Sequence, residues 1–228
     1  MDRFFNMDNK FFTAMSRVGD LIILNLLCLV LSLPLVTIGP SLTALFYVEL
    51  KMVRNEESYI VRSFFKSFKE NFKQAFIINL IMLAGGGLLW VDFSIMRSFE
   101  GGWVRVLYIM LMVILFLYLM VFTYIYPVLS KFYNTIRNTF LNSFLMAIRH
   151  LPFTLLMILV SVLPFVAFFF GPATIQTYII PVAILVGVSG VAFINAHFLV
   201  RIFDQYIPKE EEEEKEDAED PADPPAEN

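Results

Sequence analysis

The sequence predicts an all-α integral membrane protein: a polytopic helical bundle of about six membrane segments, one short or re-entrant, with amphipathic elbow helices. Two observations favour this class. With 58% hydrophobic residues, 25 phenylalanines and a mean hydropathy of +0.69, the chain is too apolar for an ordinary soluble domain. Its apolar stretches approach the roughly 20 residues that cross about 30 Å of hydrocarbon, and they lack the alternation of a membrane barrel.

Five long apolar stretches give the order of the expected spans. They cover residues 21–38, 75–96, 103–126, 151–170 and 177–198. The segment before the first stretch carries acids and aromatic residues and no small-residue cleavage site follows, so we expect no removable signal peptide. The single cysteine, Cys28, lies inside the first stretch. It excludes a disulfide framework within the chain, and we interpret it as an unreactive apolar filler.

A sixth, short segment follows the first stretch. Gly39 and Pro40 are typical of a helix end followed by the first turn of another helix, which predicts a helix over 41–53. It is short for a full span, so we expect a tilted or re-entrant helix whose preceding bend, 34–40, is buried in protein. Pro34, Gly39 and Pro40 are therefore candidate structural or gating residues.

The positive charges determine the expected orientation. With five spans, the basic residues before the first stretch would face the side opposite to the cluster at 51–73, against the positive-inside bias. With six segments, 15 of the 17 lysines and arginines share one side with both termini, and only Arg97 and Arg105 lie on the other. We therefore expect cytoplasmic termini, very short external loops and a working surface that is cytoplasmic or intramembrane.

The end of the chain differs from the rest in composition. Residues 208–228 contain eleven acids and two lysines, a net charge of −9 that leaves +5 for residues 1–207. The division predicts one membrane domain, 1–207, and a disordered acidic tail, 208–228. A tail of this kind either aids solubility or contacts a basic partner surface.

A phenylalanine- and lysine-rich stretch, 63–75, separates the short segment from the next span. Its phenylalanines recur at helical spacing and its lysines occupy another face, which predicts an amphipathic interfacial helix. Lipid anchoring is the simpler interpretation and docking of a cytoplasmic partner is the alternative. The candidate contact residues are Phe64, Phe65, Lys66, Phe68, Lys69, Phe72 and Lys73.

The elbow pattern recurs along the chain. Phe64, Phe68 and Lys73 align with Phe140, Phe144 and Arg149 at a shift of 76 positions. Phe11 and Phe12 precede the first hairpin in the same way, so the chain contains either three copies of an elbow and two spans or chance matches between phenylalanine-rich sequences. True copies would share one orientation, as in parallel transporter repeats.

Few polar groups lie deep in the expected spans. Interhelical hydrogen bonds are the expected role of Asn25, Asn79, Asn195 and His197. Glu49 is expected near an interface, where it can be hydrated. The triplet Gly85, Gly86 and Gly87 indicates either close helix packing or a flexible point in a helix that moves.

No arrangement in the sequence is typical of an active site. No pair of carboxylates faces another at mid-membrane, and no nucleophile has a base partner. His150 and His197 flank different helices and make no metal set. We therefore expect no catalytic, cofactor-binding or metal-binding residues, no enzymatic activity and no nucleic-acid partner.

Three linked stretches resemble a known family. They are 4–17, then Thr37-Ile-Gly-Pro40 continuing through Leu42-Thr-Ala-Leu-Phe-Tyr47, and 64–75. Together they resemble the YesL family of bacterial membrane proteins, which is defined as a domain of unknown function. The resemblance covers the chain up to about Tyr206 and implies a multi-pass protein of the bacterial cytoplasmic membrane associated with carbohydrate uptake.

Two functions follow as hypotheses. The first is an accessory or regulatory subunit that contacts membrane lipids and the permease subunits of a sugar-importing ABC transporter. The second is a stand-alone carrier or channel for a small solute, and a membrane enzyme is a distant third.

Overall fold

The computed structural model describes residues 2–56 and 59–206, with side chains from Met15 onward. The helices are α1 (Asp2–Leu31), α2 (Ile38–Arg54), α3 (Ile60–Met96), α4 (Gly102–Lys131), α5 (Ile136–Arg149), α6 (Leu151–Phe170), α7 (Ala173–Val182) and α8 (Val188–Phe203). A 3-10 turn, η1 (Leu35–Thr37), precedes α2, and a π-helical turn, η2 (Ala183–Gly187), joins α7 to α8. These residues contain no strand, so the all-α prediction is confirmed. The predicted tail, 208–228, lies outside the described residues.

Helix α2 lies at the centre of the fold. It packs against α1, α3, α4 and α8 and buries most of its own surface. The apolar core forms around it and includes Leu24 of α1, Leu45 of α2, Ile78 of α3 and Leu199 of α8. The short segment predicted from Gly39 and Pro40 is thus the helix against which α1, α3, α4 and α8 pack.

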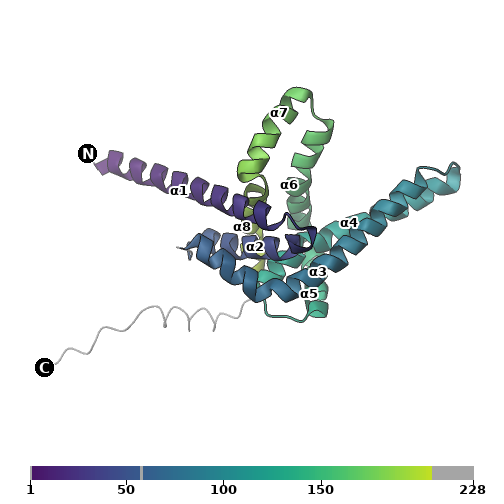
Figure 1. The fold of residues 1–228 in the computed structure, drawn as a ribbon, viewed down its shortest axis with the longest axis horizontal. Helices are drawn as coiled ribbons and strands as arrows, with labels where there is room; N and C mark the ends of the chain where they lie inside the picture. The colour runs from purple at the N-terminus through teal and green to yellow at the C-terminus, as the bar shows by residue number, and fades with distance from the viewer. Residues whose placement is uncertain (1, 57–58, 207–228) are drawn as a thin grey trace.

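Two helical hairpins project from this core in different directions (Figure 1). One is formed by the outer halves of α3 and α4, the other by α6 and α7. Because helices rise about 1.5 Å per residue, the 37-residue α3 is about 55 Å long. Most apolar side chains on the projecting halves are exposed.

Five described helices are long and apolar enough to cross a membrane. They are Leu35–Arg54, Ile60–Met96, Gly102–Lys131, Leu151–Phe170 and Ala173–Phe203. With α1, whose apolar part begins at Leu21, these helices occupy the places of the six predicted segments. The chain therefore has the helices of a multi-pass membrane protein.

The bend before α2 differs from its prediction. The first stretch does not continue to residue 38, because α1 ends at Leu31, and Pro40 lies inside the first turn of α2. The helix end is therefore at 32–37, where Pro34 has no N–H to offer a continuing helix. The prediction that the whole bend is buried is also wrong: Leu33 to Val36 are exposed, whereas Gly39, Pro40 and Ser41 are buried.

The first elbow is not a separate helix. Residues 63–75 are the start of α3, which continues into the following span without a break. The second elbow does form its own helix, α5, which ends at Arg149, and only His150 separates it from α6. Pro152 at the start of α6 accounts for the difference, because proline ends the preceding helix and fits the first turn of the next.

Candidate functional site in the polar core

Buried polar side chains gather around α2 and at the interruptions of the helices. We call this set the polar core and define it as Asn25, Glu49, Asn79, Thr154, Ser189 and Asn195. A helix that is interrupted inside a membrane leaves backbone groups that water cannot satisfy. Several members of the polar core form hydrogen bonds with such backbone groups.

Asn79 of α3 holds the bend before α2. Its Nδ2 donates hydrogen bonds to the carbonyl oxygens of Leu35, at 2.9 Å, and Val36, at 3.2 Å. The hydroxyl of Tyr126 on α4 donates to Asn79 Oδ1 at 3.1 Å, which fixes the orientation of the amide. The hydroxyl of Thr37 donates to the carbonyl oxygens of Leu31 and Pro34. Side chains thus donate hydrogen bonds to backbone carbonyl groups of the bend, although the bend is exposed.

Gly39 allows α2 to approach α3 at this point. A β-carbon at Gly39 would lie 2.6 Å from the Asn79 β-carbon and 2.7 Å from the Ala75 carbonyl oxygen. Both distances are far below van der Waals contact. The Ala75 carbonyl oxygen belongs to the backbone, so it cannot move aside as the end of a flexible side chain could. Of the predicted candidates, Gly39 is therefore a close-packing residue, and Pro40 is buried beside it.

Asn25 of α1 holds the interruption between α7 and α8. Its Nδ2 donates to the carbonyl oxygens of Ala183, at 3.2 Å, and Ile184, at 2.7 Å. Its Oδ1 accepts hydrogen bonds from the backbone N–H groups of Val188, at 2.9 Å, and Ser189, at 3.0 Å. One amide thus spans the whole π-helical turn, which follows Pro181, a residue without an N–H.

Thr154 holds the corner between α5 and α6. Its hydroxyl contacts the carbonyl oxygens of Ala147, at 2.9 Å, and His150, at 3.0 Å. The hydroxyl of Tyr124 on α4 lies 2.9 Å from the same oxygen. Sequence reasoning missed both residues, because a threonine and a tyrosine in apolar helices give no signal of the corner that they support.

Glu49 differs from the other members of the polar core. Its side chain is fully buried, and neither carboxyl oxygen has a hydrogen-bond partner among the described residues. The expectation that Glu49 is hydrated near an interface is therefore wrong. The signal for burial was its position, because Glu49 follows Leu45 by four residues and precedes Met52 by three, on the apolar face of α2.

Asn195 and His197 do not form a common site. Asn195 Nδ2 donates to the hydroxyl of Ser161 on α6 at 2.9 Å, while its Oδ1 is buried without a partner among the described residues. His197 is exposed, and its Nδ1 lies 2.9 Å from the Phe193 carbonyl oxygen of the same helix. The predicted interhelical role holds for Asn195 and is wrong for His197.

Two glycines of the α3 triplet lie against Tyr118 on α4. A β-carbon at Gly85 would meet the Tyr118 ring at 3.5 Å and one at Gly86 would meet the Tyr118 hydroxyl at 3.0 Å, whereas Gly87 faces open space. The Tyr118 hydroxyl donates to the carbonyl oxygen of Met82 at 3.0 Å. Helix α3 is continuous here, so this geometry favours the packing interpretation over the flexible point.

The first elbow has a buried and an exposed side. Phe64 is fully buried and Phe68 packs against the core, so a lipid contact for Phe64 is wrong. Phe68, Phe72 and Phe76 continue a ladder of ring contacts with centroid separations of 5.5 to 6.4 Å. The side chains that remain available to lipid or a partner are Phe65, Lys66, Lys69, Phe72 and Lys73.

Charged groups at the end of α2 pair with one another. Arg54 contacts Asp204 beyond α8 and lies 3.9 Å from Glu56, while Lys51 lies 5.0 Å above the Tyr47 ring. Arg17 of α1 donates to the Asn55 side chain. These contacts tie α1, α2 and α8 together at one end of the core.

His150 stands at the corner between α5 and α6. Its Nε2 lies 3.1 Å from the Tyr206 hydroxyl, and the Arg149 guanidinium lies 5.5 Å from the Tyr206 ring. Burial, and secondarily the charge of Arg149, lowers the pKa of His150. His150 lies between α5 and α6, and His197 lies on α8. The described residues contain no group of three or more potential metal ligands.

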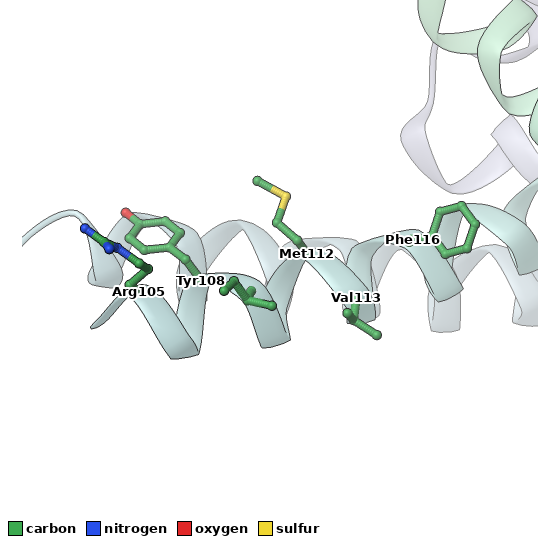
Figure 2. Close-up of a pocket in the computed structure, with 6 residues that line it drawn as sticks. Arg105, Tyr108, Met112, Val113 and Phe116 are labelled. Carbon is green, nitrogen blue, oxygen red and sulfur yellow. The ribbon is translucent and has the colours of Figure 1, made fainter. Parts of the chain in front are cut away.

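One face of the projecting half of α4 is open and shallow (Figure 2). It borders a space of about 380 Å³ and carries Arg105, Tyr108, Ile109, Met112, Val113 and Phe116. Arg105 and Tyr108 lie toward the tip of the hairpin, and Phe116 lies toward the core. A much smaller groove of about 40 Å³ lies between the ends of α2 and α4.

Comparison with known proteins adds a family match for part of the chain. No curated protein and no solved structure matches this chain. Residues 21–93, from the apolar part of α1 through most of α3, match the profile of a family described as "Protein of unknown function, DUF624". The matched region contains Asn25, Gly39, Glu49 and Asn79, so it covers α2 and the bend that precedes it.

Proposed function

We propose that this chain is a YesL-like accessory or regulatory membrane subunit, without catalytic activity of its own, that works beside the permease of a carbohydrate-importing ATP-driven transporter. The link to carbohydrate uptake rests on the sequence resemblance. The structural observation that carries the proposal is the projecting half of α4. There Val106, Ile109, Met112 and Val113 are each more than half exposed, beyond the core that holds α2.

This surface suits contact with another membrane helix. Met112 and Phe116 provide an adaptable apolar lining, while Arg105 and Tyr108 supply polar groups at the outer end. We place the chain in the bacterial cytoplasmic membrane with both termini in the cytoplasm, because this orientation puts 15 of 17 basic residues inside. The exposed lysines of the elbow then face the headgroups of the inner leaflet.

Site-specific photo-crosslinking tests the proposed subunit contact. A photoreactive amino acid at Met112 should crosslink to a permease subunit in intact membranes, and the tagged chain should co-purify with that permease in mild detergent. The matched control is Leu159, which is similarly exposed on the other hairpin. Crosslinks from Met112 to lipid alone, together with purification without any permease, would contradict the proposal.

Cysteine labelling tests the orientation. Cys28 is buried, so a new cysteine can be introduced into the otherwise unchanged chain. Glu100→Cys should react with an impermeant maleimide in intact cells, whereas Glu70→Cys should react only after permeabilisation. Gly101 is unsuitable because its φ of 135° strains any side chain. The reverse pattern would overturn cytoplasmic termini.

A second candidate function is a stand-alone carrier or channel for a small solute. The interrupted last helix and the unpartnered carboxyl of Glu49 favour it, since broken helices and intramembrane acids line the sites of many transporters. The purified chain should then move solute in liposomes without a partner. Transport by the chain alone would select this function over the accessory one.

A further inference from the structure

Glu49 is a buried acid in the centre of a membrane protein. Its relative exposure is 0%, and both carboxyl oxygens lack a hydrogen-bond partner among the described residues. From Met15 to Tyr206, the other acids whose side chains are described are partly or fully exposed. An intramembrane ionisable residue is a functional candidate by default, and here no structural contact accounts for it.

Among the described residues, no basic side chain hydrogen-bonds to the Glu49 carboxyl. On α2 itself, Lys51 lies against Tyr47, and Arg54 pairs with Asp204 next to α8. On the neighbouring helices the described basic side chains lie at the surface or at the small groove: Arg17 of α1, Arg62, Lys66, Lys69 and Lys73 of α3, Arg105 and Lys131 of α4 and Arg201 of α8. Among the described titratable groups, the Cys28 thiol of α1 lies near Glu49.

We propose that Glu49 is a proton-binding site inside the membrane region of this protein. The ligand is a single proton, which converts the carboxylate into a neutral carboxylic acid. An unpaired carboxylate in apolar surroundings is so unfavourable that such a group takes up a proton instead. The inference stands on the burial and isolation of Glu49, and it does not depend on the proposed link to a transporter.

Exchange of this proton requires a rearrangement of the helices. The Glu49 carboxyl is inaccessible to water in this arrangement, because its side chain is 0% exposed and α1 and α8 pack against α2. The carboxyl can ionise only after water or a cation from a partner enters. Glu49 thereby links protonation to the packing of α2, the helix that contacts four others.

Carbodiimide labelling tests the proposal on the purified full-length chain in detergent. A neutral carboxylic acid transfers its proton to a carbodiimide nitrogen while its oxygen bonds to the central carbon, and the acyl group then migrates to nitrogen, so no atom is lost. The apolar reagent dicyclohexylcarbodiimide should modify Glu49 at pH about 7.5, where an exposed glutamate, with a pKa of about 4.3, is ionised. Peptide mass spectrometry locates the adduct.

Glu70 is the matched control because it is an exposed glutamate on α3. A water-soluble carbodiimide with an added amine should modify Glu70 and spare Glu49. Glu49→Gln should abolish the apolar adduct at this peptide. It should also remove a protonated-carboxyl stretching band from the infrared spectrum, a readout that needs no reagent access.

Two results would overturn the proposal. One is an infrared spectrum that shows no loss of a protonated-carboxyl band in Glu49→Gln. The other is preferential labelling of Glu49 by the water-soluble reagent, which would show a hydrated carboxylate. Glu49→Asp, which keeps the acid, should retain the band if Glu49→Gln does not fold.

Discussion

The buried polar side chains near the two ends of α2 differ in their hydrogen bonding. At the start of the helix, the Asn79 amide is held by two carbonyl oxygens and a tyrosine hydroxyl, and Gly39 lets α3 approach. Three turns later, Glu49 is equally buried and has no hydrogen-bond partner among the described residues. Burial therefore does not distinguish a structural polar residue from a functional candidate. Glu49 is set apart because neither of its carboxyl oxygens has a partner among the described residues.

The largest effect should come from breaking the packed end. Gly39→Val places a β-carbon within 2.7 Å of both Asn79 and the Ala75 carbonyl oxygen, so α2 must move away from α3. We expect a loss of about 3 kcal/mol or more in the free energy of unfolding. Size-exclusion chromatography after heating in mild detergent measures the loss. Gly87→Ala is the control, because nothing lies within 4 Å of that position; an equal loss there would contradict the close-packing role.

The next largest effect should come from removing the amide. Asn79→Leu leaves the carbonyl oxygens of Leu35 and Val36 and the Tyr126 hydroxyl without their partner, at a cost of about 2–3 kcal/mol. In the Asn79→Leu background, Tyr126→Phe should cost less than in the wild type, because its partner is already gone. Thermal unfolding of the four proteins measures this coupling, and additive losses would show that the hydrogen bond is unimportant.

At the other end of α2, we expect a substitution that raises the free energy of unfolding. Glu49→Met replaces an unpartnered acid by an apolar side chain of similar size and should raise the free energy of unfolding by about 1 kcal/mol. Glu56→Met, at an exposed acid near Arg54, should change it by less than about 0.5 kcal/mol. The midpoint of thermal unfolding is the measurement. A clear destabilisation by Glu49→Met would mean that the carboxyl has a structural partner.

The smallest effect concerns pH at the corner between α5 and α6. Because the folded protein lowers the pKa of His150, the neutral imidazole favours folding above the unfolded pKa of about 6.5, and this contribution is lost as the pH falls through the lower folded value. We expect the midpoint of unfolding to fall by about 1 °C or less between pH 7.5 and 5.5 from this group. His150→Asn should remove that part of the pH dependence. An unchanged profile would exclude His150 as its source.

The two elbows show how far local sequence predicts local structure. Both contain a pair of phenylalanines four residues apart, yet 63–75 merges into α3 whereas α5 stops at Arg149. The visible difference is Pro152, which ends one helix and has no counterpart after Ala75. The position of the bend before α2 was misjudged for a related reason: Pro34 ends α1 earlier, and Pro40 is accommodated in the first turn of α2.

The sequence by itself determined the helical class, the order of the membrane segments and the existence of α2, because each follows from apolar length and from proline and glycine at known positions. It also singled out Asn25, Asn79 and Asn195 as buried amides. Only the tertiary structure decided their partners. Asn25 and Asn79 bond to carbonyl groups at breaks in distant helices, whereas Asn195 bonds to the Ser161 hydroxyl of α6. The same holds for Glu49. The sequence shows that it is an acid, but its lack of a hydrogen-bond partner among the described residues depends on which helices pack around it.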